Sequence, residues 1–186
     1  MRVITGSARG RKLRTVEGTD VRPTTERVKE ALFSAIQFDI EGGMVLDLFC
    51  GSGQLGIEAL SRGAKFAVFV DSSPESQEVT KQNLLATKLV QKARLVGRDW
   101  QSYLPGTPDR FDVAFLDPPY NKGIIGQVLP VLADKMNPGG IILCETEAPE
   151  PLPEKAGGFA IHKRYKYGRI AITMYRQQQP EEVDEA

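Results

Sequence analysis

The chain has little of several features that would assign it to a specialised class. It has two cysteines and one histidine in 186 residues, so neither a disulfide framework nor a paired-cysteine zinc site is expected. No stretch approaches the ~20 apolar residues of a membrane span, and Met1–Gly6 lacks the long apolar region of a secretion signal. With 41% hydrophobic and 26% charged residues, the chain is predicted to be one soluble, cytoplasmic globular unit with Cys50 and Cys144 as reduced, buried thiols.

The net charge is zero, but the charges are unevenly distributed. Five basic residues without an acid fall in the first fourteen positions: Arg2, Arg9, Arg11, Lys12 and Arg14. Four acids, Glu181, Glu182, Asp184 and Glu185, follow Pro180, and without them the chain has 24 basic and 20 acidic residues, a net charge of +4. A basic arm on a near-neutral body is a plausible phosphate-contacting surface, although a solvated charged hairpin explains it equally well.

Three parts follow from the pattern of glycines and apolar residues. Residues 1–43 are expected to form an extension with two short strands, 2–5 and 12–15, and a helix capped by Thr24. Residues 44–176 alternate strands and helices, which predicts a mainly parallel sheet with helices on both faces and a closing antiparallel hairpin. Residues 177–186 are predicted to be a disordered acidic tail.

A glycine-rich loop follows the first strand expected in the main domain. Residues 44–50 form a short apolar run that leads into the loop at Gly51 and Gly53. Glycines permit a tight turn and a close approach of the backbone to a ligand. The next strand ends at Asp71, about twenty residues past the first glycine, where an acid suits a hydrogen bond to ribose hydroxyls. This pattern also fits a dinucleotide-binding fold.

Asp47 separates the possible cofactors. It precedes Gly51 by four residues, where its carboxylate would repel a pyrophosphate but attract an ammonium or a sulfonium group. S-adenosylmethionine carries both, together with a ribose for Asp71 and an adenine. The strand that follows leads to Asp99, a candidate acceptor for the adenine amino group with Trp100 packed nearby. An ordinary solvated loop acid explains Asp99 equally well.

The most informative stretch is Asp117-Pro118-Pro119-Tyr120, at the end of the apolar run 111–116. The prolines end a strand because they cannot donate to its hydrogen-bond ladder, so the tetrad lands at the carboxyl end of a strand, where ligands bind in open α/β sheets. The carboxylate and rigid carbonyls accept hydrogen bonds and the tyrosine ring can stack, as an exocyclic amine on a nucleobase requires. A proline-stiffened turn with a packed tyrosine is the alternative.

Taken together, these segments resemble the class I S-adenosylmethionine-dependent methyltransferases that act on exocyclic amines. The resemblance rests on residues 47–53, Asp71 and residues 117–120. These motifs are shared by many enzymes, so they indicate the class and leave the substrate open.

The amino-terminal block narrows the resemblance. Residues 22–33, Arg-Pro-Thr-Thr-Glu-Arg-Val-Lys-Glu-Ala-Leu-Phe, with residues 2–13, resemble the RsmD-type bacterial 16S ribosomal RNA (guanine-N2) methyltransferases. The resemblance runs from about residue 1 to about residue 176. Glu26 and Cys50 stand where that family more often has Asp and Ala, and neither departure removes a functional group.

The resemblance implies a Rossmann-like class I methyltransferase fold of the α/β class, with a mainly parallel seven-stranded sheet and a small amino-terminal hairpin-and-helix extension. It implies methyl transfer from S-adenosyl-L-methionine to guanine N2 in ribosomal RNA or an assembling small ribosomal subunit, with no membrane and no metal. The expected cofactor-binding residues are Asp47, Phe49, Gly51, Gly53, Asp71 and Asp99. The expected catalytic residues are Asp117, Pro118, Pro119 and Tyr120, and the expected RNA-binding residues are Arg9, Arg11, Lys12, Arg22 and Arg27.

The sequence leaves two alternative functions open. The first is an amino-methyltransferase acting on adenine N6 or cytosine N4 of DNA or RNA, which uses the same tetrad. The second is a non-catalytic RNA- or nucleotide-binding module that keeps only the fold. The amino-terminal block disfavours the first, and the intact tetrad disfavours the second.

Three further features have an ordinary structural interpretation. The aromatic and basic residues of 165–169 are interpreted as the solvated tip of a twisted hairpin. Asn83 is interpreted as a helix-surface amide. The basic arm, residues 1–14, is expected to lack an apolar face and therefore to contribute little to cofactor binding.

Overall fold

Helices and strands alternate from residue 44 onward, as the alternation of buried runs and amphipathic runs predicts. The structure is a computed structural model that describes residues 1–17, 25–148 and 150–178. Its elements are α1 (Glu26–Ala35), β1 (Met44–Leu48), α2 (Gln54–Ser61), β2 (Phe66–Val70), α3 (Pro74–Thr87), the 3₁₀ turn η1 (Val90–Lys92), β3 (Ala93–Val96), α4 (Trp100–Tyr103), β4 (Phe111–Leu116), α5 (Ile124–Ala133), β5 (Met136–Glu147), β6 (Lys155–Ala156), β7 (Phe159–Tyr167) and β8 (Ile170–Gln177).

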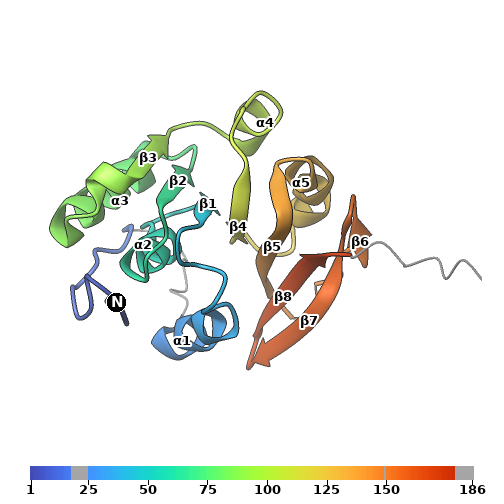
Figure 1. The fold of residues 1–186 in the computed structure, drawn as a ribbon, viewed down its shortest axis with the longest axis horizontal. Helices are drawn as coiled ribbons and strands as arrows, with labels where there is room; N and C mark the ends of the chain where they lie inside the picture. The colour runs from blue at the N-terminus through green and yellow to red at the C-terminus, as the bar shows by residue number, and fades with distance from the viewer. Residues whose placement is uncertain (18–24, 149, 179–186) are drawn as a thin grey trace, which may run out of the picture.

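Within these described ranges the strands form one eight-stranded sheet in the order β3-β2-β1-β4-β5-β8-β7-β6 (Figure 1). The first five are parallel, and β8, β7 and β6 each run antiparallel to the preceding neighbour in that order. This confirms the predicted class, with β6 as one strand more than expected. That two-residue strand pairs with β7 across a tight turn, and no hydrophobic run marks so short a strand in the sequence.

Alternate residues of the central strands divide the hydrophobic core between the two faces of the sheet. Successive side chains of a strand point to opposite faces. Val113 and Phe115 therefore pack with α1, α2 and α3, whereas Ala114 and Leu116 pack with α4 and α5. Both faces of these parallel strands are covered, which explains their nearly continuous apolar sequences.

The amino-terminal arm packs against the main domain and has an apolar face. Val3, Ala8 and Leu13 are buried in the same cluster as α1, α2 and the sheet. The expectation that the arm lacks an apolar face is therefore wrong. Its two segments lie antiparallel, with backbone hydrogen bonds such as Val3 N to Arg11 O at 2.9 Å, but only Arg2 and Lys12 form a bridge. The predicted strands are shorter than expected because the backbone of residues 4–8 hydrogen-bonds to α2.

Two local predictions also need correction. The cap of α1 is Thr25, whose hydroxyl accepts a hydrogen bond from the backbone N–H of Val28 at 3.3 Å; Thr24 lies outside the described residues. Residues 137–140, whose sequence Asn-Pro-Gly-Gly is typical of a turn before a strand, lie within β5, where the pairing with β4 shifts register. Gly139 in this irregular stretch has a φ of 77°, which glycine adopts without steric cost.

The topology brings the ends of seven described strands to one edge of the sheet. The five parallel strands, β1 to β5, all end there. Because β8 is antiparallel to β5, Ile170 at its start pairs with Glu147 at the end of β5 and with Tyr167 of β7. The tip of the β7–β8 hairpin therefore lies at the same edge as the tetrad that follows β4.

Candidate active site

The glycine loop between β1 and α2 is held in place by hydrogen bonds from two other elements. Gly51 donates its backbone N–H to Asp71 Oδ2 at 2.9 Å, and its carbonyl accepts from Thr80 Oγ1 of α3 at 2.8 Å. Phe49, at the start of the loop, has a φ of 65°, an uncommon conformation for an aromatic residue that often marks functional sites. A Cβ built on Gly51 would meet nothing within 4 Å, so this side of the loop has room for a ligand.

Asp71 lies directly after β2 and organises the loop with both carboxylate oxygens. Oδ2 accepts from Gly51 N, and Oδ1 accepts from Ser73 N at 2.9 Å. Each carboxylate oxygen has a second lone pair, so hydrogen bonds from ribose hydroxyls remain possible. Ser73 also caps α3, with Pro74 in its first turn, an arrangement typical of helix starts.

Asp47 lies on β1, buried against the first turn of α2. Its Oδ2 accepts a hydrogen bond from Gly56 N at 2.9 Å, and only 1% of the residue is exposed. Burial raises the pKa of Asp47 to about 8. Gly53, the N-cap of α2, has a φ of 76°, and a Cβ there would lie 2.7 Å from Thr80 Cγ2. The close approach requires glycine at this position.

Asn83, interpreted from the sequence as a surface amide, is instead buried. It is 1% exposed, and its Nδ2 donates to Ser52 O at 2.9 Å, in the glycine loop. The same side chain bonds both backbone groups of Arg14 in the arm. The signal that would have found it is its helical spacing from Thr80, which places both side chains on one face of α3.

The tetrad forms a structured corner after β4. Asp117 is half-buried, Pro118 is buried and Pro119 is exposed. The Tyr120 hydroxyl donates to Glu145 Oε1 of β5 at 2.9 Å. Asn121, which follows, has a φ of 57° and is held by two carboxylates of the next segment, its backbone N–H donating to Glu150 and its Nδ2 to Glu147, both at 3.1 Å.

Three carboxyl groups influence one another in this region. Burial, and then the charges of Glu145 and Asp47, raise the pKa of Asp117 well above its usual value. Burial and the same Glu145 carboxylate raise the pKa of Tyr120, so its hydroxyl keeps its proton. Such a cluster of carboxyl groups favours a cationic ligand or a donor amine.

Glu145 is a site residue that the sequence interpretation overlooked. It is 3% exposed and lies on β5 one position past Cys144, the pairing partner of Leu116, so it lies beside Asp117. Its position near the carboxyl end of a parallel strand is the signal that also singled out Asp117.

Asp99 has a local structural role. It is exposed and caps the short helix α4, its Oδ1 accepting from Ser102 N at 2.7 Å. Hydrogen bonding from Ser102 lowers the pKa of Asp99. Trp100 packs partly against the core. Local capping accounts for Asp99, and its contact with adenine stays a prediction.

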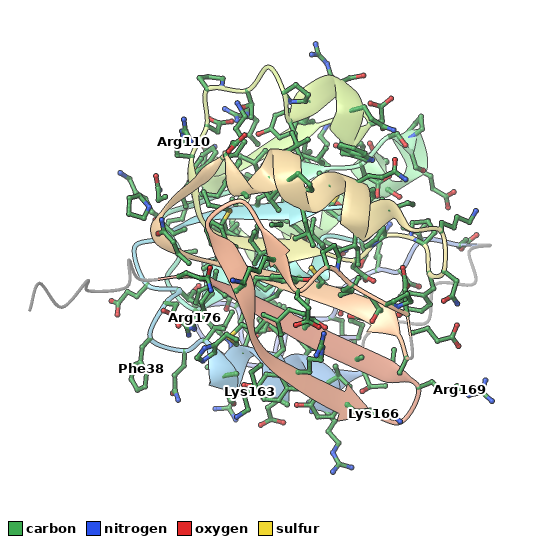
Figure 2. The ribbon with its side chains drawn as sticks, turned by 90° about the vertical axis from the view of Figure 1, so that its right-hand side faces the viewer. Phe38, Arg110, Lys163, Lys166, Arg169 and Arg176 are labelled. Atoms are coloured by element: carbon green, nitrogen blue, oxygen red, sulfur yellow. The ribbon has the colours of Figure 1, made fainter. Side chains whose placement is uncertain are left out.

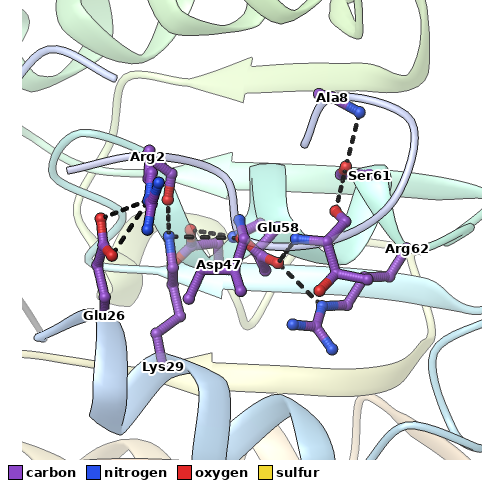
Figure 3. A network of polar contacts seen from close by, with 11 residues as sticks. Arg2, Ala8, Glu26, Lys29, Asp47, Glu58, Ser61 and Arg62 are labelled. Carbon is purple, nitrogen blue, oxygen red and sulfur yellow. Dashed lines mark hydrogen bonds and ion pairs between the residues drawn. The ribbon is translucent and has the colours of Figure 1, made fainter. Parts of the chain in front are cut away.

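A buried ion network fastens the arm and α1 to α2 (Figure 3). Glu58, fully buried, accepts from the backbone N–H groups of Ile4 and Thr5 at 2.9 and 3.0 Å. It also pairs with Lys29 at 3.4 Å and Arg62 at 2.9 Å. Burial lowers the pKa of Lys29, but its ion pair and the hydrogen bond from Nζ to the carbonyl of residue 2 at 2.7 Å satisfy the buried charge.

The described RNA-binding candidates lie on two elements, the arm and α1. Arg9, Arg11 and Lys12 are exposed on the arm, whereas Arg27 is exposed in the first turn of α1. Arg22 lies outside the described residues. Glu26, the neighbour of Arg27 in the chain, pairs with Arg2 at 3.1 Å.

The chemistry of the loop region fits a sulfonium-containing nucleoside cofactor. Gly51 leaves room on one side of the loop, Asp71 can accept from ribose, and Asp47 disfavours a pyrophosphate. Gln54 adds a buried side-chain oxygen, Oε1, that receives no hydrogen bond from the described residues. A cationic amine is a suitable donor for such an acceptor.

This sheet order, with the glycine loop after β1, the acid after β2 and the tetrad after β4, defines a class I methyltransferase. The family described as "Conserved hypothetical protein 95" matches residues 1–176, and the chain belongs to that family. The ribosomal RNA small subunit methyltransferase D of Escherichia coli strain K12 is 34% identical over 189 residues, covering 99% of this chain and 93% of the relative. The family resemblance inferred from the sequence is thus confirmed.

Solved structures agree with the fold. The yhhF protein from Escherichia coli superposes with a TM-score of 0.86 at 32% identity, covering 96% of this chain and 98% of that protein. An RNA methyltransferase from Salinibacter ruber, solved in complex with S-adenosyl-L-homocysteine, has a TM-score of 0.66 at 16% identity, covering 88% of this chain and 99% of that one. The second likeness supports the fold alone.

Neither a metal site nor a membrane span is found in the described ranges. No group of three or more histidine, cysteine, aspartate or glutamate side chains there is arranged to hold a metal ion. None of the helices there is both long and apolar enough to span a bilayer. Cys50 and Cys144 are free and buried, as the sequence predicts.

Proposed function

We propose that this protein transfers a methyl group from S-adenosylmethionine to the exocyclic N2 of a guanine in small-subunit ribosomal RNA. The observation that carries the proposal is the juxtaposition of Asp117 and Tyr120 with the loop at Gly51 on one sheet edge, in a chain that belongs to this family. The relative named ribosomal RNA small subunit methyltransferase D supports ribosomal RNA as the substrate.

Bound S-adenosylmethionine supplies an electrophilic methyl group on a sulfonium. Asp71 and the glycine loop bind and orient the nucleoside part, and the positive charge of the cofactor favours the ionised form of Asp47 on the same side. Positioning two reactants in line accounts for much of the rate of such a transfer.

Asp117 and the tetrad act on the target amine. That amine is a weak nucleophile because its lone pair is delocalised into the purine ring. The Asp117 carboxyl group and the Pro118 carbonyl accept its N–H bonds and direct the lone pair outward. Tyr120, fixed at its hydroxyl by Glu145, offers its ring to the base, which must leave its stack to react.

The proposed partner is ribosomal RNA or an assembling small ribosomal subunit, and the proposed location is the cytoplasm, where that substrate occurs. The proposed RNA contacts are the exposed cations of the arm, with Arg22 and Arg27. Residues 1–43 are proposed as the substrate-facing extension of a methyltransferase domain at 44–176.

The test is methyl transfer from radiolabelled S-adenosylmethionine to 16S RNA, small subunits and duplex DNA from a strain that lacks the gene. The expected product, identified by mass spectrometry of nucleosides, is N2-methylguanine in RNA. Methylated adenine or cytosine in DNA would support the alternative substrate class instead. RNA binding without any transfer would support a non-catalytic module.

Two variants separate chemistry from cofactor binding. Asp117→Ala is expected to lose most methyl transfer and to keep its cofactor affinity in calorimetry. Asp71→Ala is expected to weaken cofactor binding by roughly 1–3 kcal/mol, the range for leaving buried polar groups unpaired. Near-normal turnover of the Asp117 variant would refute the catalytic role of Asp117. Stronger binding of NAD than of S-adenosylmethionine by the unmodified protein would refute the proposed cofactor.

A further inference from the structure

A hollow of about 390 Å³ lies between the start of α1 and the tip of the β7–β8 hairpin. Thr25, Arg27 and Val28 line it from α1, and Lys166 and Tyr167 line it from the hairpin. These two segments are far apart in the sequence, and the antiparallel pairing of β8 with β5 brings them to the edge of the sheet that carries the tetrad.

The cations around the hollow are free of carboxylate partners within the described ranges. Glu26, the neighbour of Arg27 in the chain, pairs with Arg2, and Glu147, opposite Ile170 of the hollow, accepts from Asn121 Nδ2 at 3.1 Å. Arg27, Lys166 and Arg169 are exposed and form no ion pair with a described residue. Figure 2 shows Lys166 and Arg169 projecting together from the hairpin tip, with Lys163 farther along the same hairpin.

Aromatic surface accompanies this charge. Tyr167 lines the hollow and is only partly buried against the core. Lys163 Nζ lies 4.9 Å from the centre of the Tyr165 ring, which places a further cation along β7. Single-stranded nucleic acids are commonly bound by such a combination of cations for the backbone and ring faces for the bases.

The carboxyl groups of the candidate active site limit where an RNA backbone can lie. Asp47, Asp117 and Glu145 offer acceptor oxygens that suit a cation and a donor amine, and none of them is a cationic partner for a phosphate. The tetrad after β4 is three strand spacings from β7, roughly 14 Å at about 4.8 Å each. Stacked nucleotides rise about 3.4 Å per step along a strand, so the hollow lies within reach of nucleotides that neighbour the target.

We propose that this hollow binds a phosphate of single-stranded RNA flanking the methylated guanine, held by Arg27, Lys166 and Arg169, with a neighbouring base on the Tyr167 ring. The proposal rests on the proposed function and deepens it, since it assigns the flanking strand to the hairpin tip. It also replaces the interpretation of residues 165–169 as merely solvated.

The test compares two triple variants of equal charge change. The hollow variant combines Arg27→Gln, Lys166→Gln and Arg169→Gln. The matched control combines Lys65→Gln, Lys92→Gln and Arg110→Gln, three exposed cations that directly precede β2, β3 and β4 at the opposite edge of the sheet. Affinity for a fluorescently labelled single-stranded oligoribonucleotide containing the target guanine is measured by anisotropy over a range of salt concentrations.

The hollow variant is expected to bind more weakly, with the salt slope reduced by about 0.7 for each phosphate that the variant no longer neutralises. The control is expected to keep the slope of the unmodified protein. A double variant, Lys166→Gln with Arg169→Gln, changes only the exposed hairpin tip and leaves α1 unaltered. The same measurement is repeated with this variant. Equal slopes in hollow variant and control would overturn the proposal.

Tyr167 provides a second readout. Tyr167→Phe is expected to retain RNA affinity and Tyr167→Leu to reduce it several-fold, because only the ring supports stacking. Equal affinity of the two variants would refute stacking on Tyr167. Cofactor affinity is expected to be unchanged throughout. If the unmodified protein methylates no RNA, the proposed function itself fails. If it methylates RNA but the salt slopes of the hollow variant and the control are equal, only the proposal for the hollow is refuted.

Discussion

The side-chain amide of Asn83 hydrogen-bonds to both the backbone N–H and the backbone carbonyl of Arg14. Oδ1 accepts from Arg14 N at 2.8 Å, and Nδ2 donates to Arg14 O at 3.0 Å. The same Nδ2 donates to the carbonyl of Ser52 at 2.9 Å. One buried side chain therefore joins the arm to the loop at which the cofactor is proposed to bind.

Asn83→Ala is expected to weaken cofactor binding several-fold and to destabilise the protein by roughly 1–3 kcal/mol, because three backbone groups are left without their buried partner. Gln82→Ala is the matched control, since Gln82 accepts from the Arg14 side chain and donates to Glu78 at the surface. Calorimetry measures the affinity and urea unfolding measures the stability. Equal affinities for the two variants would show that the arm and the loop are independent.

Tyr120→Phe and Tyr120→Ala separate the hydroxyl from the ring. Tyr120→Phe removes only the hydrogen bond to Glu145, so turnover is expected to fall modestly with little change in RNA affinity. Tyr120→Ala also removes base stacking, about 1–3 kcal/mol, so RNA affinity is expected to fall as well. Steady-state kinetics with anisotropy titrations distinguish these results, and identical behaviour of the two variants would exclude stacking by the ring.

The buried Asp47 carboxyl predicts a pH dependence of stability without cofactor. Its pKa is about 8 in the folded protein, against an ordinary value of 3.8. The folded state therefore binds the proton more tightly, and this contribution to stability is fully present below about pH 4 and disappears as the pH rises to about 8. Each pKa unit corresponds to about 1.4 kcal/mol, so the decrease amounts to several kcal/mol.

Asp47→Asn is the control for this prediction, because an amide oxygen can still accept from Gly56 and does not titrate. Urea unfolding across the pH range is expected to show a decline for the unmodified protein that the variant lacks. Parallel pH profiles would mean that Asp47 is ionised in the folded protein at neutral pH.

Neutralising the arm tests a different surface. Arg9→Gln, Arg11→Gln and Lys12→Gln together are expected to weaken RNA association and reduce its salt dependence, by about 0.7 for each phosphate of a single strand that is released. Cofactor affinity is expected to stay the same, because these side chains are exposed while Asn83 holds the arm by its backbone. An unchanged salt slope would leave the hairpin tip as the principal RNA surface.

Much of the candidate site could be predicted from the sequence because its signals are local. A glycine loop after an apolar strand, an acid at the next strand end and two prolines after a third each report their position without knowledge of the fold. Glu145 and Asn83 could not be found in this way, since each becomes a site residue only through partners 25 and 31 positions away. The apolar face of the arm escaped prediction because Val3, Ala8 and Leu13 recur every five residues, a spacing that matches neither the period of a strand nor that of a helix.

The sequence by itself determined the alternation of strands and helices, and it indicated the class of cofactor and the amine chemistry that we propose for its acids and the tetrad, because periodicity and charge act over a few residues. Only the tertiary structure decided which carboxylates share one environment, that Asn83 joins the arm to the glycine loop, and that the hairpin tip lies at the edge of the active site. These relationships depend on strand order and on the antiparallel insertion of β8 beside β5. Strand order is set by packing over the whole sheet, which no local pattern specifies.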